Sequence, residues 1–450
     1  MHGYKQVNKE DILDGYDYAA WHCQRHVWPS IDAFLTAPVL ADGIHSIDCA
    51  GLPLDLLFHG SPLDISGCVV VPVFFSGAVT TRRGTHPPFF SGLGIAKTRR
   101  MPAICVADPS LALDCTLGLA WYAGNALQPI QTALAAVLQG LAIRSGRELL
   151  LIGGSGGGFA ALYYGHVLGS QASVLTWNPQ IDWLEYEETA VRHYLAVAYP
   201  DLPLPSEKGP AFRLAASNAL QSLEVVHSLL PIAEQAGVAV PRRLVYLQNA
   251  SDWHVARHAA PFMEAVEYSD LGDGFHMSLS REGFIWFGNW GKGHEAAPRD
   301  LVEFVLQRML DFDMPPAALI SEISGGEMAC YIDAKDAPRD LRQAIFSTTV
   351  KATTTGETLH AQVHLDPVPE RQGRLSYAFY LFSGEERIAT RWYENENSFV
   401  HAEVLDKPVT RVMAFVRDGF GRQLSIQETR EIARMAALPV ARDCLGSSFH

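Results

Sequence analysis

The sequence reads Leu149-Leu150-Leu151-Ile152-Gly153-Gly154-Ser155-Gly156-Gly157-Gly158-Phe159-Ala160-Ala161-Leu162 at the point that decides the fold. An apolar run leads into a Gly-x-Ser-x-Gly pattern formed by Gly153, Ser155 and Gly157, and a helix-favouring segment follows. The glycines permit a sharp strand-to-helix turn, because side chains two residues before and after the serine would collide across it. The N-terminus of the following helix then favours negative charge at the serine. The stretch predicts a nucleophilic Ser155.

Two other interpretations of this glycine-rich turn are a flexible Gly-Ser loop and a loop that binds a phosphate or a dinucleotide. A dinucleotide-binding loop would read G-x-G-x-x-G from Gly154, but Phe159 occupies the final position. No acidic residue closes the next strand, and no Gly-Lys-Ser/Thr follows, which speaks against both phosphate-binding readings.

Short apolar runs alternate with longer helical segments on both sides of the turn. The expected strands are 67–75, 102–107, 148–152, 172–177, 243–248 and 284–287, and the expected helices include 130–143 and 159–168. This alternation predicts an α/β fold with a mainly parallel sheet and helices on both faces. Residues from about 182 to 241 contain no clear strand and are expected to form a helical insertion.

The pattern changes towards the C-terminus. Asp313-Met314-Pro315-Pro316 ends the preceding helix, and apolar residues later recur with a period of two. We expect an α/β domain over residues 1–315, a linker over 316–345, and an antiparallel, immunoglobulin-like β-sandwich over 346–450.

Composition and charge limit the function classes. Hydrophobic residues make up 48% and charged residues 19%, as in ordinary globular proteins, and the net charge of -14 argues against nucleic-acid binding. No apolar run reaches the roughly 20 residues needed for a membrane span, and the polar start lacks a signal-peptide pattern. Seven scattered cysteines without a CxxC pair favour free thiols. These features predict a cytoplasmic protein, as a monomer or an oligomer.

From about His45 to Leu310 the chain resembles the α/β-hydrolase superfamily. The resemblance rests on the turn around Ser155 and on the order nucleophile, acid, histidine along the chain. It implies that His294, in a glycine-rich loop after the last strand, is the base. It also implies that Asp252, in the loop after the preceding strand, orients that histidine and stabilises its protonated form.

The residues leave alternatives open for the acid and the base. Asp182 is the other candidate acid, and His254 and His276 are the other candidate bases. His254 and His258 lie four residues apart, but they are not part of an HExxH pattern, so we expect no metal site.

The resemblance also implies where the oxyanion hole and the substrate pocket lie. The N–H of Gly156 is the first expected oxyanion donor, and the loop formed by Ser76, Gly77 and Ala78 supplies the second. The side chains expected to contact substrate follow strands or lie close to the candidate bases, and they are Trp177, Asn178, His254 and His276.

The implied reaction is acyl transfer from an ester, thioester or amide through Ser155, to water or to an acceptor hydroxyl, without a cofactor. The order of a hydrolase core and a β-sandwich resembles that of bacterial glycan- and capsule-biosynthesis proteins and accessory-secretion O-acetyltransferases. Two segments also prompt this comparison, Trp177-Asn178-Pro179-Gln180 and Gln248-Asn249-Ala250-Ser251-Asp252. The expected substrate is therefore a small-molecule or glycan ester. The alternative is a non-catalytic binding or assembly protein of a polysaccharide-biosynthesis or secretion system, built on the same core.

Overall fold

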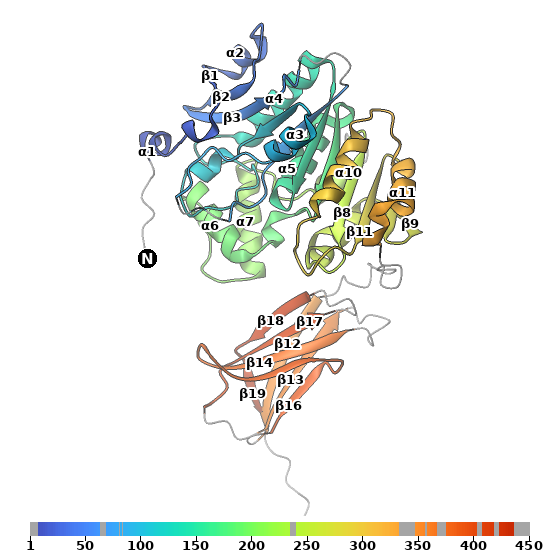
Figure 1. Ribbon diagram of the computed structural model, residues 1–450. Coiled ribbons are helices and arrows are strands. Elements are labelled where there is room, and N and C mark those ends of the chain that lie inside the picture. Colours follow the sequence, from blue (N-terminus) through green and yellow to red (C-terminus); the bar gives the residue numbers. More distant parts are fainter. Residues whose placement is uncertain are drawn as a thin grey trace, which may run out of the picture. The chain divides into compact units, whose positions relative to one another are not determined.

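The chain forms two compact units, Met1–Arg339 and Asp340–His450. The computed structural model describes residues 8–63, 69–80, 82, 84–234, 240–332, 347–355, 358–366, 375–402, 407–417 and 423–435. The first unit contains an eleven-stranded sheet and the second contains two four-stranded sheets (Figure 1).

The large sheet has a parallel centre flanked by antiparallel pairs, and its edge strand β1 runs parallel to β2. Its strand order is β1-β2-β3-β5-β4-β6-β7-β8-β11-β10-β9, and the neighbours from β5 to β11 in this order run parallel. The strands are β1 (Arg25–Trp28), β2 (Gly43–Cys49), β3 (Leu52–His59), β4 (Val70–Phe75), β5 (Ala103–Val106), β6 (Glu148–Gly154), β7 (Ala172–Trp177), β8 (Leu244–Asn249), β9 (Tyr268–Gly272), β10 (Phe275–Ser278) and β11 (Gly283–Gly288). The carboxyl ends of the parallel strands therefore meet at one edge, where ligands bind in open α/β sheets.

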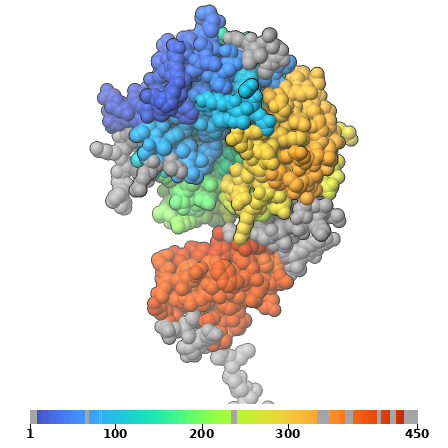
Figure 2. Space-filling view, in the orientation of Figure 1, coloured from blue at the N-terminus to red at the C-terminus, as the bar shows by residue number. Residues whose placement is uncertain are grey.

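Helices cover both faces of this sheet, as the sequence predicts. Alternate strand residues, among them Leu150 and Leu175, pack with α3, α10 and α11, which cover the face shown in Figure 2. Val174 points the opposite way and contacts α5 at Gly165. The helices are α1 (Lys9–Asp14), α2 (Ile31–Thr36), α3 (Leu93–Arg99), α4 (Ile130–Ser145), α5 (Gly156–Leu168), α6 (Glu188–Ala198), α7 (Pro210–Ser222), α8 (Leu230–Glu234), α9 (Ala260–Ala265), α10 (Arg299–Met309) and α11 (Pro316–Gly325).

One segment differs in detail from the sequence-based expectation. The region 182–241 contains α6, α7 and α8, whereas part of the expected linker 316–345 is folded. Leu319 and Ile323 of α11 are buried in the core of the first unit. The helix α10 already ends at Met309, before Pro315-Pro316, and Pro316 begins α11 because proline fits the first turn of a helix.

The sequence pattern did not reveal the strands at the two edges of the sheet. Ser46 of β2 and Asp55 of β3 are buried polar residues that interrupt the apolar pattern, and they are hydrogen-bonded to each other at 2.5 Å. At the other edge, β9 is mostly exposed and carries no apolar run. Buried polar pairs and exposed edge residues thus remove the apolar periodicity by which a strand is predicted from sequence.

The C-terminal unit is a β-sandwich. Its strands are β12 (Ser347–Thr355), β13 (Thr358–Asp366), β14 (Ser376–Ser383), β15 (Glu386–Glu394), β16 (Ser398–His401), β17 (Arg411–Arg417), β18 (Gln423–Thr429) and β19 (Ile432–Met435), ordered β16-β13-β12-β19 and β15-β14-β17-β18. Inward residues of both sheets, such as Val363 and Phe379, share one core. All pairs are antiparallel except β12 with β19, which is parallel.

No helix among the described residues has both the length and the apolar character needed to cross a bilayer. The cysteines within the described ranges are free thiols, namely Cys23, Cys49, Cys105, Cys115 and Cys330. Cys68 and Cys444 lie outside the described residues.

The glycines of the deciding stretch are required by close main-chain packing. A Cβ atom at position 153 would lie 2.2 Å from the carbonyl oxygen of Gly157. A Cβ atom at position 157 would lie 2.7 Å from the carbonyl oxygen of Phe75 at the end of β4. The first contact is the one that the sequence predicts, and the second shows that the turn also packs against a neighbouring strand.

We expect Gly153→Ala to destabilise the first unit by about 3 kcal/mol, because backbone atoms cannot move aside as the tip of a side chain can. Urea unfolding followed by tryptophan fluorescence measures the change. Gly94→Ala in α3 is the matched control, since a Cβ atom there meets no atom within 4 Å. Alanine in this helix should be neutral or stabilise by up to about 1 kcal/mol. Equal unfolding midpoints for the two variants would contradict the packing argument.

Candidate active site

Ser155 lies in the tight turn between β6 and α5, at the carboxyl edge of the sheet. Its backbone has φ 54° and ψ −120°, a conformation that residues other than glycine rarely adopt. The Ser155 N–H donates to the carbonyl of Trp177 at 3.0 Å, and the Ser155 carbonyl accepts from Gly158 and Phe159 as α5 begins. The hydroxyl group thus stands at a helix N-terminus, where developing negative charge is favoured.

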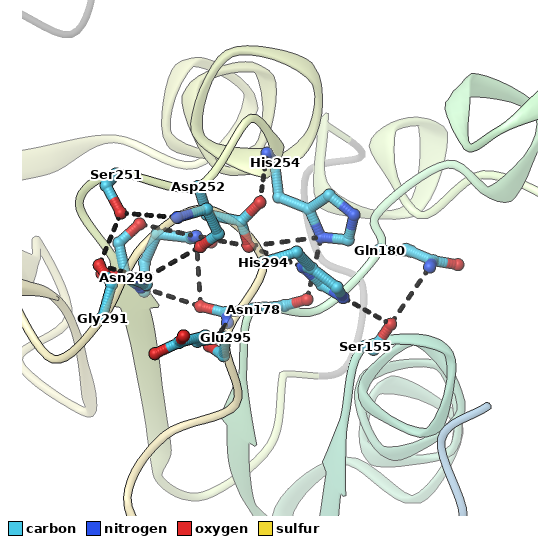
Figure 3. Close-up of polar contacts among 12 residues, drawn as sticks. Ser155, Asn178, Gln180, Asn249, Ser251, Asp252, His254, Gly291, His294 and Glu295 are labelled. Carbon is cyan, nitrogen blue, oxygen red and sulfur yellow. Dashed lines mark hydrogen bonds and ion pairs between the residues drawn. The ribbon is translucent and has the colours of Figure 1, made fainter. Parts of the chain in front are cut away.

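Ser155, His294 and Asp252 form a continuous hydrogen-bonded chain (Figure 3). The Nε2 atom of His294 lies 3.0 Å from Ser155 Oγ, and Nδ1 lies 2.7 Å from Asp252 Oδ2. The Asp252 side chain is fully buried, whereas 29% of the His294 side chain is exposed. Because the carboxylate accepts from Nδ1–H, Nε2 is free to take the serine proton. The fold therefore brings together the three residues that the sequence singles out.

The loop after β11, which carries His294, is hydrogen-bonded to the loop after β8. Ser251 Oγ donates to the carbonyl of Gly291 at 2.7 Å and accepts from the N–H of Gly293 at 2.9 Å. Asn249 Nδ2 donates to the carbonyls of Gly291 and Gly293 at 3.2 and 2.8 Å. These bonds fix the position of the histidine relative to the acid.

The candidate oxyanion donors separate into two groups. Gly156 begins α5, and Gly77 lies beside the nucleophile, since a Cβ atom at position 77 would lie 4.0 Å from Ser155 Cβ. Ser76 does not fit the expected role, because its N–H donates to the hydroxyl of Tyr122 at 2.7 Å. The geometry leaves Gly156 and Gly77 as the candidate pair.

Trp177 and Asn178 support the site from within the fold. The Trp177 ring covers Gly154, where a Cβ atom would lie 2.0 Å from the indole nitrogen. Asn178 is buried; its Nδ2 donates to the carbonyl of Glu295 at 2.6 Å, and its Oδ1 accepts from the N–H of Asn249 at 2.7 Å. Its amide group is therefore occupied in joining the loops after β7, β8 and β11. The expectation that Asn178 contacts substrate does not fit this arrangement.

His254 packs directly against His294, with ring centroids 4.0 Å apart. It is fully buried, and its Nδ1 donates to the carbonyl of Asn178 at 3.0 Å. His258 is also buried, and its Nδ1 accepts from the N–H of Ile181 at 3.2 Å. Burial lowers the pKa of His254 well below its usual value and lowers the pKa of His258 to about 3. Both rings are therefore neutral at pH 7, and His254 supports the candidate base instead of facing solvent.

Two other predicted residues lie away from the nucleophile. His276 is on β10, and its ring packs against Phe287 with centroids 5.5 Å apart. Asp182 lies 3.2 Å from Nδ1 of His227 in the helical insertion. Within the described part of the chain, neither residue contacts His294, so the structure gives no support to Asp182 as its acid or to His276 as a substrate contact.

One side chain at the nucleophile was not predicted from the sequence pattern. Gln180 Nε2 donates to Ser155 Oγ at 3.2 Å, on the side away from His294 (Figure 3). The only available signal was its place in the Trp177-Asn178-Pro179-Gln180 phrase that follows β7. A glutamine in a loop carries no pattern of its own, so the periodicity could not assign it a role.

Asp252, His254 and His294 also offer donor atoms that lie within 4.8 Å of one another, as a metal site would. However, His294 Nδ1 is already bonded to Asp252, and His254 Nδ1 donates to the carbonyl of Asn178. A cation would have to replace both hydrogen bonds, so the arrangement fits proton transfer better than metal binding.

A cavity of about 1080 Å³ lies next to the candidate oxyanion loop. Its wall includes Ala78, which follows Gly77, and Leu119, which lies against Gly156. Tyr186 of the helical insertion is also part of the wall. A cavity of this size is large enough for a small organic molecule.

No family model and no curated protein matches the chain. Solved structures match it at low identity. The capsule O-acetyltransferase of Neisseria meningitidis serogroup A is 12% identical, with a TM-score of 0.39, over 61% of this chain and 96% of that one. Acetyl xylan esterase 1 from Thermoanaerobacterium sp. is 10% identical, with a TM-score of 0.37, over 62% of this chain and 86% of that one.

The Pyrococcus horikoshii acylaminoacyl peptidase is 15% identical, with a TM-score of 0.37, over 61% of this chain. The chain spans only 41% of that peptidase. The strand order and the turn at Ser155 give the first unit the α/β-hydrolase fold, which confirms the predicted fold class.

Buried neutral histidines make stability depend on pH. The unfolded chain protonates His258 near pH 6.5, but the folded chain does so only near the lowered pKa of about 3, so stability is lost as the pH falls below 6.5. Between pH 7 and pH 5, the free energy of unfolding should therefore fall by about 2 kcal/mol less for His258→Gln than for wild type. Glutamine keeps a hydrogen-bond acceptor for the N–H of Ile181. Urea unfolding at both pH values tests this, and an unchanged pH dependence would refute it.

Proposed function

We propose that the chain is an acyl-transfer enzyme in which Ser155 is the nucleophile, His294 is the base and Asp252 orients the base. The observation that carries the proposal is the chain of contacts of 3.0 and 2.7 Å that links the three side chains. The α/β-hydrolase fold supports it, because this fold places a nucleophile, an acid and a histidine in loops at one sheet edge in this order.

In the proposed reaction, Ser155 Oγ attacks the acyl carbon while its proton passes to His294 Nε2. The carbonyl electron pair moves onto oxygen, and the N–H groups of Gly156 and Gly77 donate hydrogen bonds to this negatively charged oxygen. The bond to the leaving group then breaks, and His294 returns the proton to the departing atom. Water or an acceptor hydroxyl releases the acyl group by the same steps in reverse.

We propose an ester of a small molecule or of a glycan as the substrate. The cavity beside the oxyanion loop supports a polar substrate, because its wall combines apolar side chains with Thr80, Arg82, His86, Thr116 and His193. Hydroxyl and imidazole groups can hydrogen-bond sugar hydroxyls, and the apolar part can contact an acyl chain. The free thiols fit an enzyme of a reducing compartment such as the cytoplasm.

The first test compares wild type with Ser155→Ala on p-nitrophenyl acetate, with intact mass spectrometry to detect an acyl adduct. We expect turnover or an adduct for wild type and neither for the variant. Wild type that reacts neither with this ester nor with a fluorophosphonate probe would favour the non-catalytic alternative.

A second test concerns the acid. We expect Asp252→Asn to lower kcat by about 10⁴-fold, because the amide would hold the wrong histidine tautomer. Asp182→Asn is the matched control and should leave kcat within about twofold, since Asp182 contacts His227 and does not touch His294. Equal losses for the two variants would contradict the assignment of the acid.

A further inference from the structure

Gln180 is attached to the nucleophile by both its main chain and its side chain. Its N–H donates to the carbonyl of Ser155 at 3.2 Å, and its Nε2 donates to Ser155 Oγ at the same distance. The residue is fully buried. Ser155 Oγ therefore lies between two partners, His294 on one side and Gln180 on the other (Figure 3).

The direction of the Gln180 amide is fixed by chemistry. Its oxygen accepts from the indole N–H of Trp121. An indole N–H can only donate, so the oxygen must face Trp121 and the NH₂ group must face Ser155. Ser155 Oγ thus receives a hydrogen bond from the Gln180 NH₂ group, because the amide cannot flip and present its oxygen to the serine.

Trp121 is itself held rigidly. Its ring is buried and stacks on Trp183 with centroids 5.1 Å apart, and it meets Tyr194 edge-on at 5.4 Å. Aromatic packing on two sides keeps the indole N–H pointed at Gln180. A donor oriented in this way before the reaction needs no reorganisation when charge appears.

We propose that Gln180 is a further catalytic residue, which stabilises the negative charge on Ser155 Oγ as the serine proton passes to His294. This inference rests on the proposed function. The Gln180 N–H donates to Oγ both when the serine attacks the acyl carbon and when the acyl group is released. In attack, Oγ loses its proton while its electron pair forms the bond to the acyl carbon. In release, that bond breaks, the pair returns to Oγ, and His294 gives the proton back.

The hydrogen bond is strongest at these two moments, because a charged oxygen accepts more strongly than a neutral hydroxyl or an ester oxygen. Gln180 is neutral and buried, so it supplies this donor at every working pH without introducing a charge beside Asp252 and His294.

Gln180→Met tests the donor, since methionine has nearly the same length but no N–H. We expect kcat on p-nitrophenyl acetate to fall about 100-fold with KM changed by less than about threefold, as for loss of one preorganised donor. The rate of labelling by a fluorophosphonate should fall in parallel. Gln131→Met is the matched control, because Gln131 is a buried glutamine whose amide is hydrogen-bonded to the main chain of Val226. It should leave kcat unchanged.

Gln180→Glu distinguishes a donor role from a purely structural role, because only the donor role makes the activity of this variant depend on the protonation of residue 180. An ionised carboxylate cannot donate to Oγ, but a protonated one can. Measured against wild type at each pH, the activity of Gln180→Glu should therefore recover as the pH is lowered. Thermal unfolding of every variant shows whether it is folded.

The outcomes separate the two proposals. If wild type shows neither turnover nor an acyl adduct and does not react with the fluorophosphonate, the proposed function fails. If wild type reacts and the folded Gln180→Met variant matches it, or if the ratio of Gln180→Glu to wild type does not vary with pH, the role of Gln180 is overturned. The role of Gln180 is supported if kcat falls for the variants at position 180 but not for Gln131→Met, and if the activity of Gln180→Glu recovers relative to wild type at lower pH.

Discussion

The geometry of the site depends on a main-chain contact between the start of α5 and the end of β4. Gly157 approaches the carbonyl oxygens of Phe75 and Ser76 so closely that a Cβ atom would lie 2.7 and 2.8 Å from them. This contact places Gly77 beside the turn that holds Ser155 at φ 54°. The distance between the nucleophile and the candidate oxyanion loop is thus set by backbone atoms, which leave little room for adjustment.

The remainder of the site is built from neutral groups around one buried carboxylate. Asp252 accepts from His294 at 2.7 Å and from the N–H of His254 at 3.0 Å, which offsets the cost of burying its charge. Burial keeps His254 uncharged next to His294. A second positive charge there would oppose protonation of the base. The surrounding amides, such as Asn178, bond the loops together and add no charge.

The sequence predicted the parts of this protein that follow from strong local patterns. The apolar runs located the central strands, and the glycines around Ser155 located the turn, because each depends on residues that are adjacent in the chain. The edge strands were missed, since Ser46 and Asp55 satisfy each other only after folding. The same reason explains why the sequence revealed neither the contact of Gln180 with Trp121 nor that of the Ser76 N–H with Tyr122, because these partners are distant in sequence.

The aromatic packing of Trp121 restricts movement of the helical insertion. Trp183 and Tyr194 belong to the helical insertion, and both are fully buried. Tyr194 is also hydrogen-bonded to the carbonyl of Gly124 in the body of the unit at 2.6 Å. Lifting this part of the insertion as a lid would expose both rings to water, at roughly 2 kcal/mol each, and would unstack Trp121. The described part of the insertion that carries Trp183 and Tyr194 is therefore held in place by the same aromatic packing that orients Trp121.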